Sequence, residues 1–415
     1  MKRDPGVGWR LVGFLTLLAA SGVLWSGMAQ ATSQWSRQTK MECVDCHSVF
    51  PRLNPTGEKF LRDGYSLISA HGEEAEAETG PVIGNVNNLL GFRVNMTPIG
   101  YETHSLVADS TNGDLKGRWT VGSPIWIQFF AAGRLFPHVS FFSELEYTQS
   151  GFKYNWFYFN FTRLNKSTWL NGQVGNISPL EFASYPNRLP QLPALKGEVM
   201  LLKSSNGGGD EHGMDMSSAR PGIQYFGHSE AATVYAGVSP GPTGRDVNNK
   251  IHYWAGLVGR VPESQNVIGG SSATLHYYHG TDTRNSALLF AENDWSRLSP
   301  QINLRCSDKL DVQWAYVWAK EDNRALVALP AKDYKYQGTA LETGYMPNDK
   351  WQVGAHYDWY QQGEKGDVIG KFHRVVPTVT RVLNQNWRAT VYFEHNLRDV
   401  PNKVDKIYLN VRTMF

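Results

Sequence analysis

The chain has 415 residues, a length that allows two or three domains, yet only 19% of its residues are charged, 13% are aromatic and 40 are glycine. Its formal net charge of +2 provides no basic stripe, so nucleic acid is excluded as a partner. Three cysteines cannot build a disulfide framework.

The N-terminal residues have the pattern of an export signal. Basic residues precede an apolar run over 11–25, and Ala29-Gln30-Ala31 matches a small-residue cleavage site. The run is shorter than the about 20 apolar residues of a membrane span, although an uncleaved anchor stays an alternative. We therefore expect residues 1–31 to be a signal peptide and the mature chain to begin at Thr32.

The next segment contains a Cys-Val-Asp-Cys-His motif at residues 43–47. This C-x-x-C-H spacing attaches a c-type haem covalently: Cys43 and Cys46 bind the porphyrin vinyl groups, and the tether holds His47 beneath the iron as the proximal ligand. A disulfide or half of a zinc site is the alternative, but zinc needs a second ligand pair, and none follows. We expect one covalent haem c, and because it is attached outside the bacterial inner membrane, the motif agrees with the export signal.

A helix is predicted directly after the haem motif. Asn54 followed by Pro55 has the pattern of an N-cap with proline at the first helical position, and about four turns could follow. Phe60 and Leu61 then fall on a face that would pack on the porphyrin.

The haem domain is expected to extend from residue 32 to residue 80, linker included. His71 is the leading candidate for the sixth, distal iron ligand, with Met96 and His104 as alternatives. A segment of some forty ordered residues is too small to fold without outside support. The haem and the rest of the chain should therefore complete its core.

Residues 81–415 contain segments of about ten residues in which polar and apolar side chains alternate. The predicted strands lie near 89–97, 124–133, 137–148, 154–164, 168–177, 197–204, 221–228, 231–238, 250–261, 271–279, 297–306, 309–319, 335–346, 350–361, 372–382, 386–397 and 404–415. One of these segments should be a loop, because a bacterial single-chain barrel has an even number of strands.

This pattern predicts an all-β transmembrane β-barrel of about 16 antiparallel strands, in place of a soluble sandwich. Ile407, Leu409 and Val411 would face lipid, and the terminal Phe415 resembles the C-terminal signal of outer-membrane proteins. We expect location in the cell outer membrane, with outer-membrane lipid and the barrel-assembly machinery as partners. Sixteen strands enclose an aqueous lumen, in which the small α-helical cytochrome domain could sit as a plug.

The motif, the Phe50-Pro51-Arg52-Leu53-Asn54-Pro55-Thr56-Gly57 stretch, the Phe60–Tyr65 segment and the barrel together resemble the fused monohaem cytochrome–porin family of outer-membrane ferrous-iron oxidases. Carried over residue by residue, the functional positions of the family are Cys43, Cys46 and His47. The resemblance implies an oxidoreductase that oxidises extracellular ferrous iron at the haem held by His47. The electrons would pass to a periplasmic cytochrome c or copper protein.

Two other functions remain open. The same haem could carry electrons outward to an extracellular acceptor, or the protein could be a passive porin that its haem domain plugs. The connector over residues 207–216 holds carboxylates and a histidine suited to weak Fe²⁺ contact. It could equally be a solvated loop.

Overall fold

The structure is a computed structural model. It describes residues 34–65, 89–103, 117–148, 151–186, 197–204, 214–241, 250–263, 267–286, 289–326, 333–364, 370–384, 386–397 and 405–414. The predicted signal peptide, the linker that contains His71, and His104 lie outside these ranges. Phe415 lies outside them as well.

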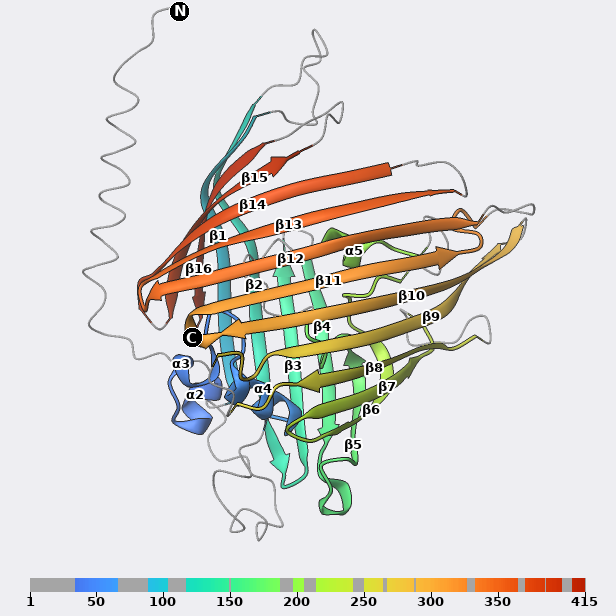
Figure 1. Ribbon diagram of the computed structural model, residues 1–415, viewed down its shortest axis with the longest axis horizontal. Helices are drawn as coiled ribbons and strands as arrows, with labels where there is room; N and C mark the ends of the chain where they lie inside the picture. The colour runs from blue at the N-terminus through green and yellow to red at the C-terminus, as the bar shows by residue number, and fades with distance from the viewer. Residues whose placement is uncertain are drawn as a thin grey trace, which may run out of the picture.

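Within the described ranges, sixteen antiparallel strands close into one barrel, in which β1 pairs with β16 (Figure 1). The strands are β1 (Leu90–Glu102), β2 (Arg118–Phe136), β3 (Val139–Thr148), β4 (Gly151–Phe161), β5 (Asn171–Ile177), β6 (Arg220–His228), β7 (Ala232–Ser239), β8 (His252–Arg260), β9 (Ser272–Ser286), β10 (Leu289–Cys306), β11 (Leu310–Glu321), β12 (Tyr334–Asn348), β13 (Trp351–Glu364), β14 (Gly370–Val382), β15 (Trp387–Asn396) and β16 (Lys406–Met414). The predicted barrel is confirmed, and a soluble sandwich is ruled out because the sheet closes on itself.

Strand β8 illustrates why the sequence forms a membrane barrel. Successive side chains point to opposite faces of a strand. Trp254 and Val258 are buried toward the lumen, whereas Tyr253 and Leu257 are 46% and 57% exposed on the outside. Large apolar residues on the outer face are stabilised by lipid and would be unfavourable in water.

The pairing of β1 with β16 defines the two ends of the barrel. Arg93 lies opposite Met414, so the first strand begins at the end where the last strand finishes. The turns 137–138 and 349–350 lie at this end, whereas the long connector 178–219 leaves from the other. Because outer-membrane barrels have short periplasmic turns and longer extracellular loops, we call the first end the periplasmic mouth and the second the extracellular mouth.

Exposed aromatic side chains mark both interfaces of the membrane. Trp351 and Trp387 lie beside the periplasmic mouth, and Trp119 and Tyr154 lie toward the extracellular mouth. Two such belts flank the apolar band of outer-membrane barrels. Together with the closed barrel, they confirm the predicted location in the outer membrane.

One predicted strand is wrong. Residues 197–204 contain the short helix α5 (Glu198–Leu201) instead, with Val199 and Met200 buried inside the barrel. A short apolar run does not distinguish a strand from a buried helix by periodicity. Without this segment, the number of predicted strands is even, as a bacterial barrel requires.

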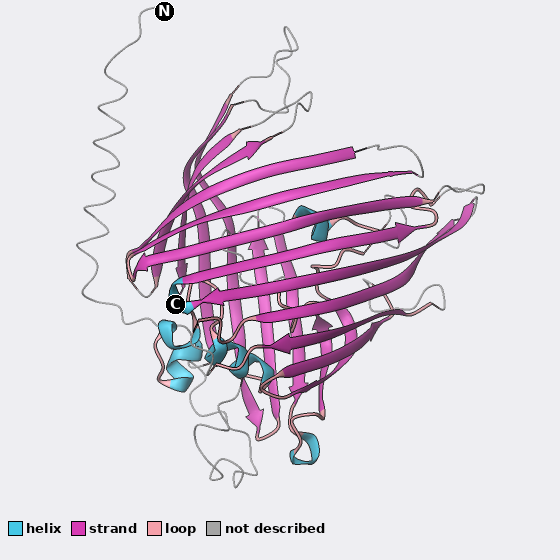
Figure 2. Cartoon of the chain, in the orientation of Figure 1, coloured by secondary structure: helices cyan, strands magenta, loops and turns pink. Residues whose placement is uncertain are grey.

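The N-terminal residues 34–65, called the plug from here on, form three short helices. They are α2 (Gln34–Thr39), α3 (Cys43–Cys46) and α4 (Pro55–Arg62), and Figure 2 shows them gathered at the end of the barrel that carries the C-terminus. The Asn54 side chain accepts a hydrogen bond from the Gly57 N–H at 2.9 Å, which confirms the predicted N-cap. Helix α4 has about two turns, however, and not the four that we expected.

Two short 3₁₀ helices, η3 (Leu164–Lys166) and η4 (Ser307–Lys309), lie in turns at the periplasmic mouth. Within the described ranges, no helix has both the length and the apolar content that crossing a membrane demands.

Candidate functional site

The Cys-Val-Asp-Cys sequence forms the single helical turn α3. The Asp45 side chain accepts a hydrogen bond from the Glu42 N–H at 2.8 Å at the start of this turn, and the His47 N–H donates to the Cys43 carbonyl at 3.0 Å at its end. The turn therefore brings Cys43, Cys46 and His47 to the wall of one cavity, as the motif predicts.

The hydrogen bonds of His47 determine which ring nitrogen carries the proton. Its Nδ1 atom lies 2.9 Å from the Pro51 carbonyl oxygen and 3.2 Å from that of Arg52. Because a carbonyl oxygen only accepts, Nδ1 donates and Nε2 keeps its lone pair. Burial lowers the pKa of His47 to about 4. A neutral, oriented imidazole with its other nitrogen available is what iron ligation requires.

Cys43 and Cys46 form no disulfide and are both half-buried. Burial, followed by the negative charge of Asp45, raises the pKa of Cys46 to about 11, and burial also raises the pKa of Cys43. Zinc binding requires thiolates and further ligands. Among the described residues, no three His, Cys, Asp or Glu side chains are grouped as metal ligands. The donor set fits covalent haem better than zinc.

The cavity next to α3 has a volume of about 670 Å³, which is within the range of cofactor sites. Phe60 and Leu61 line it, on the face of α4 that the sequence pattern singled out. Trp35 stacks on Tyr65 with ring centroids 4.8 Å apart and meets Phe60 edge-on at 5.2 Å. These rings form an apolar wall of the kind that a porphyrin packs against.

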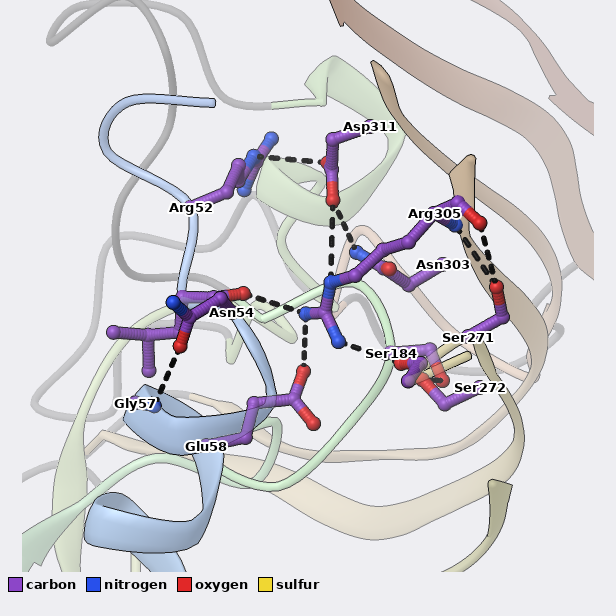
Figure 3. Close-up of polar contacts among 12 residues, drawn as sticks. Arg52, Asn54, Gly57, Glu58, Ser184, Ser271, Ser272, Asn303, Arg305 and Asp311 are labelled. Atoms are coloured by element: carbon purple, nitrogen blue, oxygen red, sulfur yellow. Dashed lines mark hydrogen bonds and ion pairs between the residues drawn. The ribbon is translucent and has the colours of Figure 1, made fainter. Parts of the chain in front are cut away.

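Charged contacts fix one side of the plug to the barrel (Figure 3). The Glu58 carboxylate points toward Arg305 of β10 in Figure 3, and the two groups lie 2.6 Å apart. It also lies 3.5 Å from Arg260 of β8. Arg52 forms ion pairs with Glu342 of β12 and with Asp311 of β11, the latter at 3.8 Å. The barrel therefore supplies the outside support that the short plug was expected to need.

Glu58 is ionised because its surroundings are strongly positive. Burial opposes its ionisation, but the neighbouring guanidiniums of Arg305, Arg260 and Arg62 outweigh that effect and lower the pKa of Glu58 to about 2. A partly buried carboxylate held by several cations is a strong anchor.

Polar contacts also hold the opposite side of the plug. The Tyr65 hydroxyl lies 2.6 Å from that of Tyr158 on β4, and Gln38 donates to the Ala132 carbonyl of β2 at 2.8 Å. Because β2 and β4 are separated around the barrel from β10 and β12, the plug bridges the lumen. The predicted arrangement of a small helical region inside the barrel mouth is confirmed.

The structure tests one of the alternatives for the sixth ligand. Met96 lies between Asn95 and Thr97, which are both buried toward the lumen, so its side chain is on the outer face of β1 and cannot reach the cavity. Met41 and Met414 line the cavity instead. Met414 was not among the predicted ligands, although the alternation of β16 places it on the lumen face. His71 stays a prediction.

Only the end of the predicted iron-contact loop is described. Met214 and Met216 are buried inside the barrel, and Asp215 accepts hydrogen bonds from the backbone N–H groups of Ser217 and Ser218 at 2.8 and 2.6 Å. The Asp215 carboxylate therefore stabilises a turn and is not oriented for a metal ion. Residues 207–213 lie outside the described residues.

Three arginines on the cavity wall were missed by sequence reasoning. Arg93, Arg388 and Arg412 come from β1, β15 and β16, which are neighbours in the barrel. No local sequence signal marks them, because they meet only when the last strands close against the first.

Known outer-membrane proteins are similar to this chain in fold. No protein-family profile matches the chain, and no curated protein sequence does. Its fold is similar to that of the outer-membrane channel DcaP of Acinetobacter baumannii, with a TM-score of 0.55 and 13% identity over 79% of this chain and 96% of the other. It is also similar to an anion-selective porin from Comamonas acidovorans, with a TM-score of 0.53 and 12% identity over 79% and 98% of the two chains. OmpT, an outer membrane protein of Vibrio cholerae, gives a TM-score of 0.53 at 10% identity over 81% of this chain and all of the other.

These similarities define the class of fold. The chain has the 16-stranded barrel of outer-membrane porins, and its mouth contains a helical plug that carries a C-x-x-C-H motif.

Proposed function

We propose that this protein is a member of the fused monohaem cytochrome–porin family and works as an outer-membrane electron conduit. It would oxidise extracellular ferrous iron and pass the electrons to a periplasmic carrier. The observation that carries the proposal is the placement of His47, with a neutral and oriented imidazole, on the wall of a cavity inside the barrel mouth.

A covalent haem c would supply a one-electron centre through which one electron leaves Fe²⁺, giving Fe³⁺, and reduces an oxidised periplasmic cytochrome c or copper protein. No proton is transferred, so the site needs no general acid or base. Cys43 and Cys46 would attach the cofactor, and His47 would ligate its iron. The hydrogen bond from His47 to Pro51 fixes the ring and raises its basicity as a ligand.

The lumen supports an approach of iron from outside. Glu181 and Phe182 line the cavity, and they belong to the connector that begins at the extracellular mouth and folds inward. Glu144 and Glu146 of β3 add carboxylates to the same wall. Hard carboxylate oxygens suit brief contact with Fe²⁺ without a tight site that would retain the product.

A passive porin is the second candidate, and the fold favours it directly because the similar structures are porins and channels. In that function the plug would block or gate the lumen, and the ion pairs of Glu58 and Arg52 would hold it closed. Outward transfer of electrons to an extracellular acceptor would use the same haem with the opposite direction of flow.

Rapid mixing of the oxidised protein with excess Fe²⁺ tests the proposal. The α-band of reduced haem should grow in the wild type, and His47→Ala protein should show no such band. A wild-type band that stays flat, while a low-potential donor reduces the haem readily, would exclude iron oxidation and favour outward transfer. A wild type with no haem spectrum but with ion conductance would favour the passive porin.

A further inference from the structure

Arg388 and Arg412 lie directly opposite each other on the neighbouring strands β15 and β16. Residues in this relation have Cβ atoms about 5 Å apart, and like charges placed so are destabilising. Arg412 is also opposite Asn95 of β1, and Arg93 lies two residues before Asn95 on the same inward face. Three strands therefore present three cations to one patch of the lumen wall, called the arginine patch from here on.

Arg388 and Arg412 differ in their partners from several other lumen arginines. Arg52, Arg305 and Arg374 each form an ion pair with a carboxylate. Among the described residues, Arg388 and Arg412 form none: Arg412 donates to the Asn95 side chain at 2.8 Å, and Arg388 lies over the Phe50 ring. Arg412 is buried and Arg388 is half-buried, and a cation in such a place is costly without an anionic partner. This pair therefore fits an anion that the protein chain does not supply.

The position of the patch indicates which anion this is. The Arg388 guanidinium carbon is 5.1 Å from the centre of the Phe50 ring, and that ring stacks on His47 with centroids 5.4 Å apart. All three arginines line the same cavity as Cys43, Cys46 and His47. A haem has two propionate carboxylates at one edge, and guanidinium groups bind carboxylates in bidentate geometry.

We propose that Arg93, Arg388 and Arg412 bind the propionate carboxylates of the haem. This inference rests on the haem attachment proposed above, and it does not depend on iron oxidation. The arginine patch then has two roles. It orients the haem within the mouth of the barrel, and its positive charge favours the reduced form of the haem and so raises the midpoint potential.

The test uses the purified full-length holoprotein, with sodium dithionite as reductant so that no step requires Fe²⁺. Arg388→Gln and Arg412→Gln are each compared with Arg381→Gln. Arg381 is the matched control because it lies at the same level of the barrel on β14 but stacks outside on Trp351, at 4.8 Å. The propionate bending modes in the resonance Raman spectrum and the midpoint potential are the two readouts.

We expect both patch variants to shift the propionate modes and lower the midpoint potential, while Arg381→Gln changes neither. Arg388→Lys should restore most of the potential, because the charge is retained. If a variant does not fold, transfer of the wild type into D₂O should still shift the propionate modes, since guanidinium N–H groups exchange.

Unchanged propionate modes in the glutamine variants, or no isotope shift in the wild type, would overturn the inference. A midpoint potential that responds to added inorganic phosphate would show that the patch holds a free anion instead, which also overturns it. A wild type without any haem spectrum would overturn the proposed cofactor together with this inference. Iron oxidation could fail while every one of these haem readouts stays as expected.

Discussion

Replacement of Glu58 by Gln should loosen the plug, because it removes the anchor to Arg305 and Arg260 while keeping the side-chain shape. The pKa of Glu58 is lowered from 4.5 to about 2 in the folded protein. At about 1.4 kcal/mol per pKa unit, the ionised carboxylate contributes ~3 kcal/mol. Removing one partner of a largely buried ion pair such as this one costs about the same amount.

Hydrogen–deuterium exchange of the intact protein measures this loss locally. A loss of ~3 kcal/mol corresponds to an increase of about a hundredfold in the opening of the plug. Peptides from residues 34–65 should exchange that much faster in Glu58→Gln, while those from the barrel strands do not change. Lys59→Gln, which removes an exposed charge from the same helix, is the control and should resemble the wild type. Equal protection of the plug in Glu58→Gln and wild type would refute the proposed anchoring.

The same anchor has a defined dependence on pH. A carboxylate with a lowered pKa stabilises the folded state fully above about pH 4.5, and this contribution is lost as the pH falls toward 2. Burial raises the pKa of Asp63, which has the opposite effect on stability. The difference in plug stability between wild type and Glu58→Gln isolates the contribution of the Glu58 carboxylate. We expect Glu58→Gln to pass more current than the wild type through planar bilayers, and this excess should shrink as the pH falls from about 4.5 toward 2. A constant excess would contradict the assignment.

Three further outcomes follow from the site. Cys46→Ala should abolish covalent haem staining of the full-length band on a denaturing gel, whereas Cys306→Ala at the end of β10 should keep it; undiminished staining in the first variant would disprove attachment. His71→Ala should convert a low-spin spectrum to a high-spin one, and Met96→Leu on the outer face should not. An unchanged His71→Ala spectrum would mean that another residue is the sixth ligand, with Met41 and Met414 of the cavity wall as the candidates. Asn54→Ala should destabilise α4 by about 1 kcal/mol, seen as faster exchange of its first-turn amides, and unaltered exchange would mean that the cap contributes nothing.

Local patterns in the sequence were sufficient to predict most of the barrel strands. In β16 the alternation of Ile407, Leu409 and Val411 with buried residues such as Asn410 follows the predicted lipid-facing pattern, because a period of two is a property of the strand itself. The Asn54 cap was also predictable, since its hydrogen bond reaches only three residues along the chain. The helix at Glu198 was misread because four residues are too few to establish a period.

The contacts that position the plug could not be predicted in this way. Glu58 and Arg305 are 247 residues apart in sequence, and Arg52 and Glu342 are 290 apart. Each is an ordinary charged residue in its own segment, and only closure of the barrel brings the pairs together. The arginine patch was missed for the same reason, because Arg93 lies on the first strand and its partners lie on the last two.

We propose that electrons cross the outer membrane through this chain. The direct measurement uses lipid vesicles that contain the purified protein, with oxidised cytochrome c trapped inside and Fe²⁺ added outside. The Cys46→Ala protein provides the same barrel without covalent haem, and so controls for Fe²⁺ that leaks through the lumen. We expect rapid reduction of the trapped cytochrome c with the wild type and little with Cys46→Ala. Equal rates with the two proteins would contradict it and leave the passive porin as the function.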